Sequence, residues 1–316
     1  MTLTSIVTGG AGFIGSHIAE RLLKEGQRVR IVDNFLSGKL ENLAHLAEFG
    51  DALEIYKVSV TDLDALRPLF ADVDTVFHQA ALPSVPRSIA APLETHENCV
   101  TGTLNVLIAA RDSGVRRVVY AASSAAYGDK EEPTAVETMS LRPISPYGAA
   151  KVAGELYCQS FTQVYGLETV CLRYFNVFGA RQDPKSQYAA VVPLFITSML
   201  KGDPPIIYGD GEQSRDFIYI DNVVQGNLLA SQSADAVGQV MNLATGSRTT
   251  LLELMEKLNA LMGTQIAPIH AEARSGDIKH SGASIALAET LLDYAPVVDF
   301  ETGLARTIDW YRQHGG

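Results

Sequence analysis

Short apolar segments that alternate with helix-like segments restrict the fold of this chain more than any other feature. Each segment is apolar at consecutive positions and ends in polar or glycine-rich residues. Strands that are apolar on both faces lie in parallel sheets covered by helices on both sides. We predict an α/β fold with a doubly wound parallel (Rossmann) sheet and with helices at residues 13–24, 40–47, 63–70, 93–112 and 147–165. The strand segments are TSIVTGG, QRVRIVDN, ALEIYKV, VDTVFHQAA, VRRVVYAASS and LETVCLRYFN.

The sequence changes in character after residue 175. Polar stretches rich in proline and glycine, GARQDPKSQY and KGDPPIIYGDGEQSRDF, separate helices predicted at residues 191–200 and 221–230. We expect residues 1–175 to form the Rossmann domain, with segments near residues 215–245 returning to it. Residues 176–316 are expected to form mainly a smaller, interleaved α/β substrate domain, with the ligand site in the cleft between the two.

The composition argues against several classes of partner. The formal net charge is −11 at pH 7, whereas proteins that bind nucleic acid carry a clustered excess of Lys and Arg. No apolar run approaches the ~20 residues that span a bilayer, and the first residues do not resemble a secretory signal. The three cysteines lack CxxC or Cys/His ligand spacing. We expect a cytoplasmic protein without a metal site and without a nucleic-acid or membrane partner.

The stretch IVTGGAGFIGSHIAERLL places Gly9, Gly12 and Gly15 between a strand and a helix. Glycines with this spacing allow a tight turn and a close approach of the backbone to a pyrophosphate at the helix N-terminus. Asp33 ends the next strand, where an acid binds the adenosine ribose hydroxyls. Its carboxylate would repel a 2′-phosphate, so we predict NAD as the cofactor rather than NADP. Asp62 is placed either to bind the adenine amino group or to cap a helix.

The stretch SPYGAAKVAGELY carries Tyr147 and Lys151 four residues apart, on one face of a predicted helix. A phenol with a pKa of about 10 is a poor base at neutral pH, but a nearby ammonium and a positively charged nicotinamide ring would lower that pKa. Tyr147 is therefore a candidate general base, and Lys151 is a candidate for holding the nicotinamide ribose. The alternative is an ordinary Tyr and Lys on an exposed helix.

Taken together, the glycine loop, the YxxxK pair and the upstream serines resemble the extended short-chain dehydrogenase/reductase family. The resemblance covers nearly the whole chain, because HQAA, LRYFNVFG, GDGEQSRDFIYIDNV and RSGDIKHS are similar to its branch that modifies nucleotide sugars. Within that branch the chain most resembles the UDP-hexose 4-epimerases. The stretches SVPRS, ASSAAYGD and NVFGARQDP are similar to the group that accepts N-acetylated UDP-hexosamines.

The resemblance implies a role for each residue that matches a family motif. On the cofactor side, the glycine loop approaches the pyrophosphate, the residues after the second strand contact the adenosine, and Tyr174 flanks the nicotinamide. The full set implied for NAD is Gly9, Gly12, Phe13, Ile14, Gly15, Asp33, Asn34, Ser37, Asp62, Gln79, Ala80, Ala81, Ala121, Tyr147, Lys151 and Tyr174.

The resemblance also implies a UDP-hexose site. Two arginines bind the diphosphate, as guanidinium groups commonly do, and a small residue at position 281 leaves room for an N-acetyl group. The residues implied for the substrate are Ser84, Ser123, Ser124, Asn176, Gln182, Val192, Tyr208, Arg215, Arg274, Asp277 and Ser281.

The segment SSAAYG distinguishes between the reactions of the branch. Related dehydratases resemble STDEVYG and related decarboxylases resemble STSEVYG, so their acids align with Ser124 and Ala125. A 4,6-dehydration needs an acid there, whereas epimerisation at C4 does not. In an epimerisation Tyr147, assisted by Ser123, removes the proton of the C4 hydroxyl, and NAD accepts and returns the hydride. We expect Ala125 and Ala126 to leave room for the sugar to turn.

The resulting prediction is an NAD-dependent C4 epimerase of UDP-GlcNAc/UDP-GalNAc, UDP-Glc/UDP-Gal, or both. The alternatives are a UDP-glucuronate 4-epimerase, another NAD-dependent nucleotide-sugar oxidoreductase, and a non-catalytic dinucleotide-binding module. The helices at 93–112 and 147–165 carry apolar residues on more than one face. In relatives these helices form a four-helix bundle, so we expect a homodimer.

Overall fold

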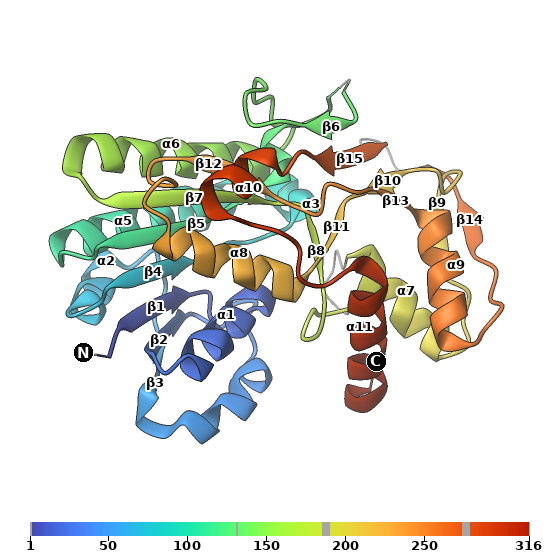
Figure 1. Cartoon of the computed structure of the whole chain (residues 1–316), viewed down its shortest axis with the longest axis horizontal. Coiled ribbons are helices and arrows are strands. Elements are labelled where there is room, and N and C mark those ends of the chain that lie inside the picture. Colours follow the sequence, from blue (N-terminus) through green and yellow to red (C-terminus); the bar gives the residue numbers. More distant parts are fainter. Residues whose placement is uncertain (1, 131, 185–189, 274–278, 316) are drawn as a thin grey trace.

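A sheet of seven parallel strands is the main element of the computed structural model, which describes residues 2–130, 132–184, 190–273 and 279–315. The strand order is β12-β7-β5-β4-β1-β2-β3, so the winding reverses between β1 and β4 (Figure 1). The predicted doubly wound parallel sheet is thereby confirmed. The strands are β1 (Thr4–Thr8), β2 (Arg28–Asp33), β3 (Leu53–Lys57), β4 (Thr75–His78), β5 (Arg117–Ser123), β7 (Glu168–Tyr174) and β12 (Val240–Leu243).

Neighbouring residues of one strand pack against opposite faces of this sheet. In β1, Val7 belongs to one cluster of buried apolar side chains and Ile6 to a second. Helices α1 (Phe13–Lys24) and α8 (Ile220–Gln232) contribute to the first cluster, and α5 (Gly102–Asp112) and α6 (Pro146–Tyr165) to the second. Figure 1 shows the two pairs of helices on opposite sides of the sheet. Burial on both faces explains why the strand segments are apolar at consecutive positions.

Local signals fix the ends of α6, the helix that carries Tyr147 and Lys151. The Ser145 hydroxyl caps its N-terminus by accepting a 3.1 Å hydrogen bond from the Gly148 amide, and Pro146 occupies its first turn. Gly166 ends the helix with a φ of 72°, a conformation that glycine adopts without steric cost. The predicted helix at 147–165 is thus found one residue longer, and α1 has the predicted bounds.

Three other predicted helices are less regular than expected. The segment at 93–112 consists of α4 (Pro92–His96), a π-helical turn η3 (Glu97–Thr101) and α5. The segment at 63–70 divides into α2 (Leu63–Leu66) and the 3-10 segment η2 (Arg67–Phe70), in which Pro68 lacks the amide that a continuing α-helix needs. The segment at 40–47 is a longer 3-10 segment, η1 (Leu40–Ala52).

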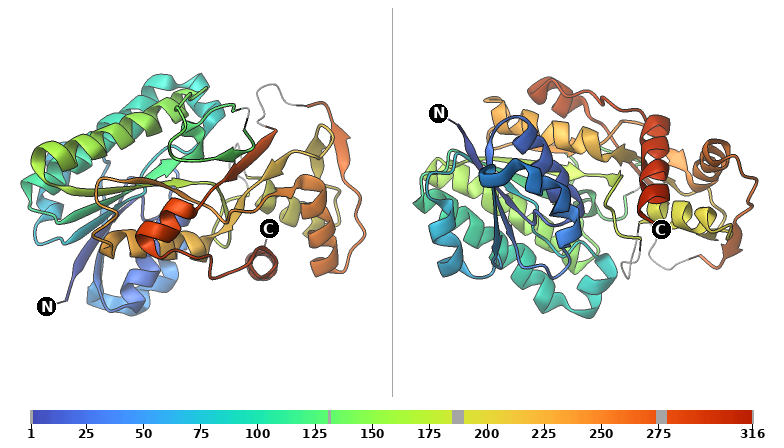
Figure 2. Two further views of the ribbon diagram at one scale, coloured as in Figure 1. Left: turned by 45° about the horizontal axis from the view of Figure 1, so that its top comes forward. Right: turned by 90° about the horizontal axis from the view of Figure 1, so that it is seen from below.

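Part of the second half of the chain packs beyond one end of the sheet. Figure 2 shows α7 (Val191–Leu200) and α9 (Leu251–Met262) there, whereas α8 and β12 belong to the layers of the sheet. The remaining elements of the first half are α3 (Val85–Ala90), η4 (Ser124–Ala126) and β6 (Thr134–Ala135). Those of the second half are β8 (Asn176–Phe178), β9 (Ile206–Tyr208), β10 (Ser214–Arg215), β11 (Phe217–Tyr219), β13 (Thr249–Thr250), β14 (Ile269–Ala271), β15 (His280–Ala283), α10 (Ala286–Leu292) and α11 (Phe300–His314).

The two halves of the chain exchange strands. Strand β6 from the first half joins β13, β10 and β15 in a four-stranded sheet, and β12 from the second half extends the large sheet beside β7. The division at residue 175 stays a prediction. Within the described residues, no helix is both long and apolar enough to cross a membrane.

Candidate functional site

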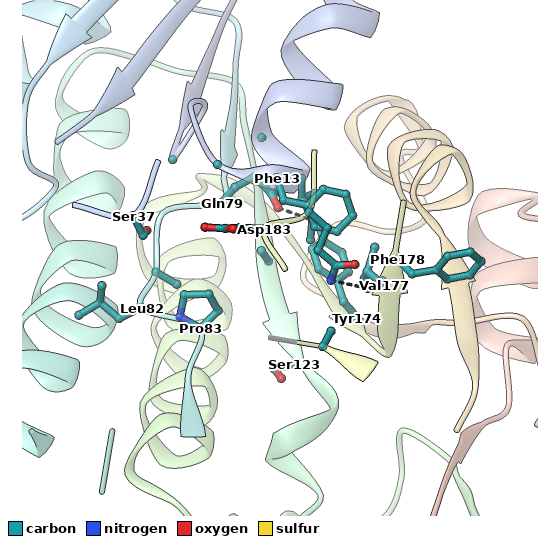
Figure 3. Close-up of a pocket in the computed structure, with 18 of the residues that line it drawn as sticks. Phe13, Ser37, Gln79, Leu82, Pro83, Ser123, Tyr174, Val177, Phe178 and Asp183 are labelled. Carbon is teal, nitrogen blue, oxygen red and sulfur yellow. Dashed lines mark hydrogen bonds between the residues drawn. The ribbon is translucent and has the colours of Figure 1, made fainter. Parts of the chain in front are cut away.

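A cavity of about 720 Å³ lies at the carboxyl ends of the parallel strands and extends into the second half of the chain. In doubly wound folds this edge of the sheet, at the point where the winding reverses, is where ligands bind. Figure 3 shows Phe13, Gln79, Tyr174 and Ser123 around it. The cavity therefore brings together segments from β1, β4, β5 and β7 that are far apart in the sequence.

The glycine loop after β1 is packed so closely that side chains are excluded from it. Gly9 has a φ of +67°, and a Cβ atom there would lie 2.7 Å from the Ala80 amide nitrogen. A Cβ atom on Gly15 would lie 2.3 Å from the Gly9 carbonyl oxygen. Gly12 precedes α1, and no side chain caps this helix, so its first amides are available to a phosphate. The loop thus fits the pyrophosphate of a dinucleotide.

Asp33 lies beside the glycine loop at the end of β2. Its carboxylate accepts hydrogen bonds of 3.0 Å from the Ala11 amide and 2.8 Å from the Phe35 amide. Burial raises the pKa of this carboxyl, and the two hydrogen bonds oppose the rise. Two amides do not use all the lone pairs of a carboxylate, so Asp33 can still accept from the ribose hydroxyls of NAD. The residues present therefore fit this cofactor.

Tyr147, Lys151 and Ser123 meet where α6 begins beside the end of β5. The Ser123 hydroxyl accepts a 3.2 Å bond from the Ala125 amide, and the buried Lys151 ammonium donates a 2.6 Å bond to the Ala121 carbonyl oxygen. Burial raises the pKa of Tyr147, while the nearby Ser123 hydroxyl opposes this rise. Burial lowers the pKa of Lys151. In the protein alone, burial therefore keeps the phenol protonated.

The structure changes the interpretation of the segment SSAAYG. Ser123 and Ser124 line the cavity, whereas Ala125 and Ala126 are not among its lining residues, and Ala126 is fully buried. The expectation that these alanines enlarge the sugar site is therefore wrong. Of Ser124 and Ala125, the two positions that align with acids in related enzymes, only Ser124 lines the cavity. Its side chain is a hydroxyl where the resemblance places an acid.

Most of the predicted site residues line this one cavity, although their individual roles stay predictions. Arg274 and Asp277 lie outside the described residues. The predicted residues along the cavity are Gly9, Gly12, Phe13, Ile14, Gly15, Asp33, Asn34, Ser37, Gln79, Ala80, Ala81, Ala121, Ser123, Ser124, Tyr147, Lys151, Tyr174, Asn176, Gln182, Val192, Tyr208 and Arg215.

Three predicted residues do not line the cavity. Asp62 caps α2 by accepting a 3.1 Å bond from the Ala65 amide, which is the alternative that the sequence left open. Ser84 likewise caps α3. Ser281 lies in β15 directly opposite Arg215 of β10. Residues paired in this way point to the same face of a sheet, so Ser281 is a neighbour of a cavity residue.

The sequence interpretation missed several polar residues of the cavity. Their positions depend on tertiary contacts, and the only local signal was that the arginine and aspartate at 181 and 183 lie in a motif stretch, NVFGARQDP. The missed residues are Lys39, Asn42, Asn98, Arg181, Asp183 and Gln213. In the described ranges, no group of three or more His, Cys, Asp or Glu residues is arranged to hold a metal ion.

The chain is similar to known proteins over nearly its full length. A UDP-glucose 4-epimerase of Mycolicibacterium smegmatis is 37% identical over 313 residues, covering 98% of this chain and 99% of that protein. A UDP-N-acetylglucosamine 4-epimerase of Methanobrevibacter ruminantium M1, solved with UDP-N-acetylmuramic acid, is 42% identical with a TM-score of 0.94, covering 99% and 100% of the two chains. A UDP-glucose 4-epimerase of Thermotoga maritima, solved with UDP-glucose, is 36% identical with a TM-score of 0.93, covering 99% of each.

The family model for NAD dependent epimerases and dehydratases matches residues 5–244. This range contains the whole seven-stranded sheet except the start of β1, together with the glycine loop, Tyr147 and Lys151. The chain is therefore an NAD-dependent enzyme that belongs to the NAD dependent epimerase/dehydratase family.

Proposed function

We propose that the protein interconverts UDP-hexoses that differ in configuration at C4. The observation that carries this proposal is the cluster of Tyr147, Ser123 and Lys151 in the same cavity as the glycine loop and Arg215. A sugar held between these groups would have its C4 hydroxyl beside the phenol. The similarity to 4-epimerases over the full chain supports the same reaction.

In this proposal the chain holds and moves one proton. When bound, NAD would supply the hydride acceptor and a positive charge. Tyr147 takes the proton of the C4 hydroxyl and later returns it, and the neighbouring Ser123 hydroxyl would orient both oxygens. Lys151 lies with its ammonium 5.9 Å from the centre of the Tyr147 ring, so its charge favours the phenolate.

The hydroxyl of Ser124, in place of an acid, favours epimerisation over elimination. Dehydration of the sugar would require an acid to protonate the departing hydroxyl at C6, and this position of the cavity carries the Ser124 hydroxyl. A hydroxyl with no pKa near neutrality is a poor proton donor. An epimerase needs no such donor, because the hydroxyl groups of its substrate are all retained.

The substrate side of the cavity is suited to a nucleoside diphosphate sugar. Arg215 and Asn176 line it, and the Asn176 side chain donates a 3.0 Å bond to the Asp216 carbonyl oxygen, which fixes its position. An arginine in such a cavity favours a diphosphate. We infer that UDP-GlcNAc, UDP-Glc or both are substrates, since similar proteins carry both names.

We also propose that two copies of the chain associate through α3, α4 and α6. These helices contact one another, and each exposes large apolar side chains on the surface. The exposed fractions are 64% for Ile89, 84% for Leu93, 60% for Leu156 and 66% for Val164. Exposed apolar patches of this kind mark protein interfaces. Light scattering should report a dimer for the unchanged protein and a monomer for the Leu93→Glu, Leu156→Glu variant.

The test of the proposed reaction is incubation with UDP-GlcNAc, UDP-Glc and UDP-glucuronate in separate reactions without added NAD, with the products resolved by NMR. We expect a mixture of C4 epimers from at least one of the first two substrates. Epimerisation of UDP-glucuronate alone would establish the alternative, and net formation of NADH or loss of carbon dioxide would refute the proposal. Tyr147→Phe should lower the rate at least ~100-fold while NAD stays bound.

A further inference from the structure

Two ion pairs join the segment after β8 to the elements that hold the dinucleotide. Arg181 is paired with Glu20 of α1. Asp183 is paired with Lys39, which follows the loop after β2, over an N–O distance of 2.6 Å. Arg181, Asp183 and Lys39 all line the cavity, and Figure 3 shows Asp183 in the region of Phe13 and Ser37. Neither pair belongs to the catalytic cluster at Tyr147.

Arg181 is held in an uncommon conformation by several contacts with α1. Its φ of 65° lies in the left-handed region, which costs energy for a residue other than glycine. One guanidinium nitrogen donates a 3.0 Å bond to Nδ1 of His17, and His17 Nε2 donates a 3.0 Å bond to the Ala180 carbonyl oxygen. Burial lowers the pKa of His17 to about 3, so this ring is neutral and can accept from Arg181. The Glu20 carboxylate and the His45 ring are further partners of Arg181.

The second pair is anchored at both ends. On one side, the Lys39 amide donates a 2.9 Å bond to the carbonyl oxygen of Ala11 in the glycine loop. On the other, the Gln182 carbonyl oxygen, next to Asp183, accepts a bond from Tyr311 of α11. An ion pair between two such fixed segments loses less side-chain freedom than one between mobile segments. The Lys39–Asp183 pair therefore joins two segments that hydrogen bonds already hold in place.

We propose that the Arg181–Glu20 and Lys39–Asp183 pairs act as a latch that slows the release of NAD from its groove. The proposal rests on NAD binding in this cavity, as the family assignment requires. An enzyme that returns the hydride to the same substrate has no need to exchange its cofactor between turnovers. A latch beside the glycine loop, outside the cluster of Tyr147, Ser123 and Lys151, would retain NAD while nucleotide sugars exchange.

The test measures the release of bound NAD⁺, which excess alcohol dehydrogenase and ethanol reduce and absorbance at 340 nm reports. We expect Lys39→Met and Asp183→Asn each to accelerate release about twofold to fivefold. The double variant should be no faster than the faster single variant, because both changes break one interaction. Added salt should accelerate release from the unchanged protein more than from the double variant. Arg181→Met and Glu20→Gln, which change the second pair, should each accelerate NAD⁺ release as well, and their double variant should be no faster than the faster single variant.

A matched control is Glu25→Gln, which breaks the Arg21–Glu25 pair on the same helix. Neither residue of that pair lines the cavity, so release should be unchanged. Acceleration by Lys39→Met alone would overturn the latch and assign Lys39 to direct contact with the cofactor. Additive effects or no effects would also overturn it. The assay contains no sugar, so the proposed reaction can fail while the latch holds; a protein that binds no NAD would refute both.

Discussion

The Lys151 ammonium donates a 2.6 Å hydrogen bond to the Ala121 carbonyl oxygen, and this bond ties α6 to β5 two residues before Ser123. Lys151 also lies 4.9 Å from the centre of the Tyr120 ring, a distance at which a cation is attracted by an aromatic face. Lys151 belongs to the same helix as Tyr147, and its charged group contacts the strand that carries Ser123. The proposed catalytic geometry and the local stability therefore involve the same side chain.

Replacing Lys151 by methionine should lower both activity and stability. The buried Ala121 carbonyl would lose its partner, which costs about 1–3 kcal/mol in the free energy of unfolding. Without the ammonium, the pKa of Tyr147 should rise further, so the rising limb of the pH–rate profile should move to higher pH. Urea denaturation and a pH series of epimerisation rates would measure the two effects. A slower enzyme with an unchanged pH profile would limit Lys151 to a structural role.

The buried pair of Arg173 in β7 and Glu155 in α6 should be far more important for stability than surface pairs. Two bonds of 2.9 and 2.8 Å join these side chains, which are 4% and 2% exposed. Glu155→Gln would leave a buried guanidinium without its counter-charge, so we expect a loss of about 3–5 kcal/mol in the free energy of unfolding.

The control for this prediction is Glu301→Gln, since the pair of Glu301 with Lys257 is exposed. This change should cost less than about 1 kcal/mol. Urea denaturation of both variants compares them directly, and equal losses would contradict the argument from burial.

Asp216 should make stability depend on pH between about 4 and 6. Burial raises the pKa of this carboxyl from 3.8 to about 6, although hydrogen bonds from Thr245 and Gly246 oppose the rise. In that pH range the folded protein keeps a proton that the unfolded chain loses, so the free energy of unfolding falls as the pH increases. The full effect is on the order of 2–3 kcal/mol.

Asn at position 216 does not titrate, so the Asp216→Asn variant should lack this contribution. Its lost hydrogen bonds lower stability equally at every pH. Relative to the unchanged protein, the variant should therefore gain stability from pH 4 to pH 6.5 in urea titrations. A stability difference that stays constant over this range would show that Asp216 is ionised throughout.

Ser281 offers a test of sugar selection. Because it lies opposite Arg215 on the same face of the small sheet, a larger side chain there should reach toward the substrate side of the cavity. We expect Ser281→Tyr to lower kcat/KM for UDP-GlcNAc about tenfold more than for UDP-Glc, which lacks the acetamide. Ser281→Ala should leave both values nearly unchanged. Equal losses with the two sugars would remove position 281 from the specificity argument.

The parts of the site that are encoded locally could be predicted from the sequence. The bounds of α1 follow from its apolar periodicity, and the need for glycine at 9 and 15 follows from the spacing of the glycine loop. Asp62 and Ser84 each precede a helix and cap it. This local role is the ordinary one for Asp and Ser in that position, and it competed with the ligand roles that the resemblance implied.

Features that depend on tertiary contacts could not be predicted. The π-helical turn at Glu97–Thr101 inserts into an otherwise regular apolar pattern, and Asn98 in this turn lines the cavity. The pairing of Lys39 with Asp183 joins distant parts of the chain, and no periodicity in the sequence reports it. The raised pKa of Asp216 likewise arises from the side chains packed around it.

The position of β12 has a consequence for how the protein can be made. This strand, Val240–Leu243, completes the sheet beside β7, although more than sixty residues of the second half precede it in the chain. During synthesis, β7 is an unpaired edge strand until β12 has been made, and exposed edge strands pair readily with other chains. A fragment that ends at residue 175 should therefore aggregate, so the part of the chain that carries the glycine loop should not fold without the part that follows it.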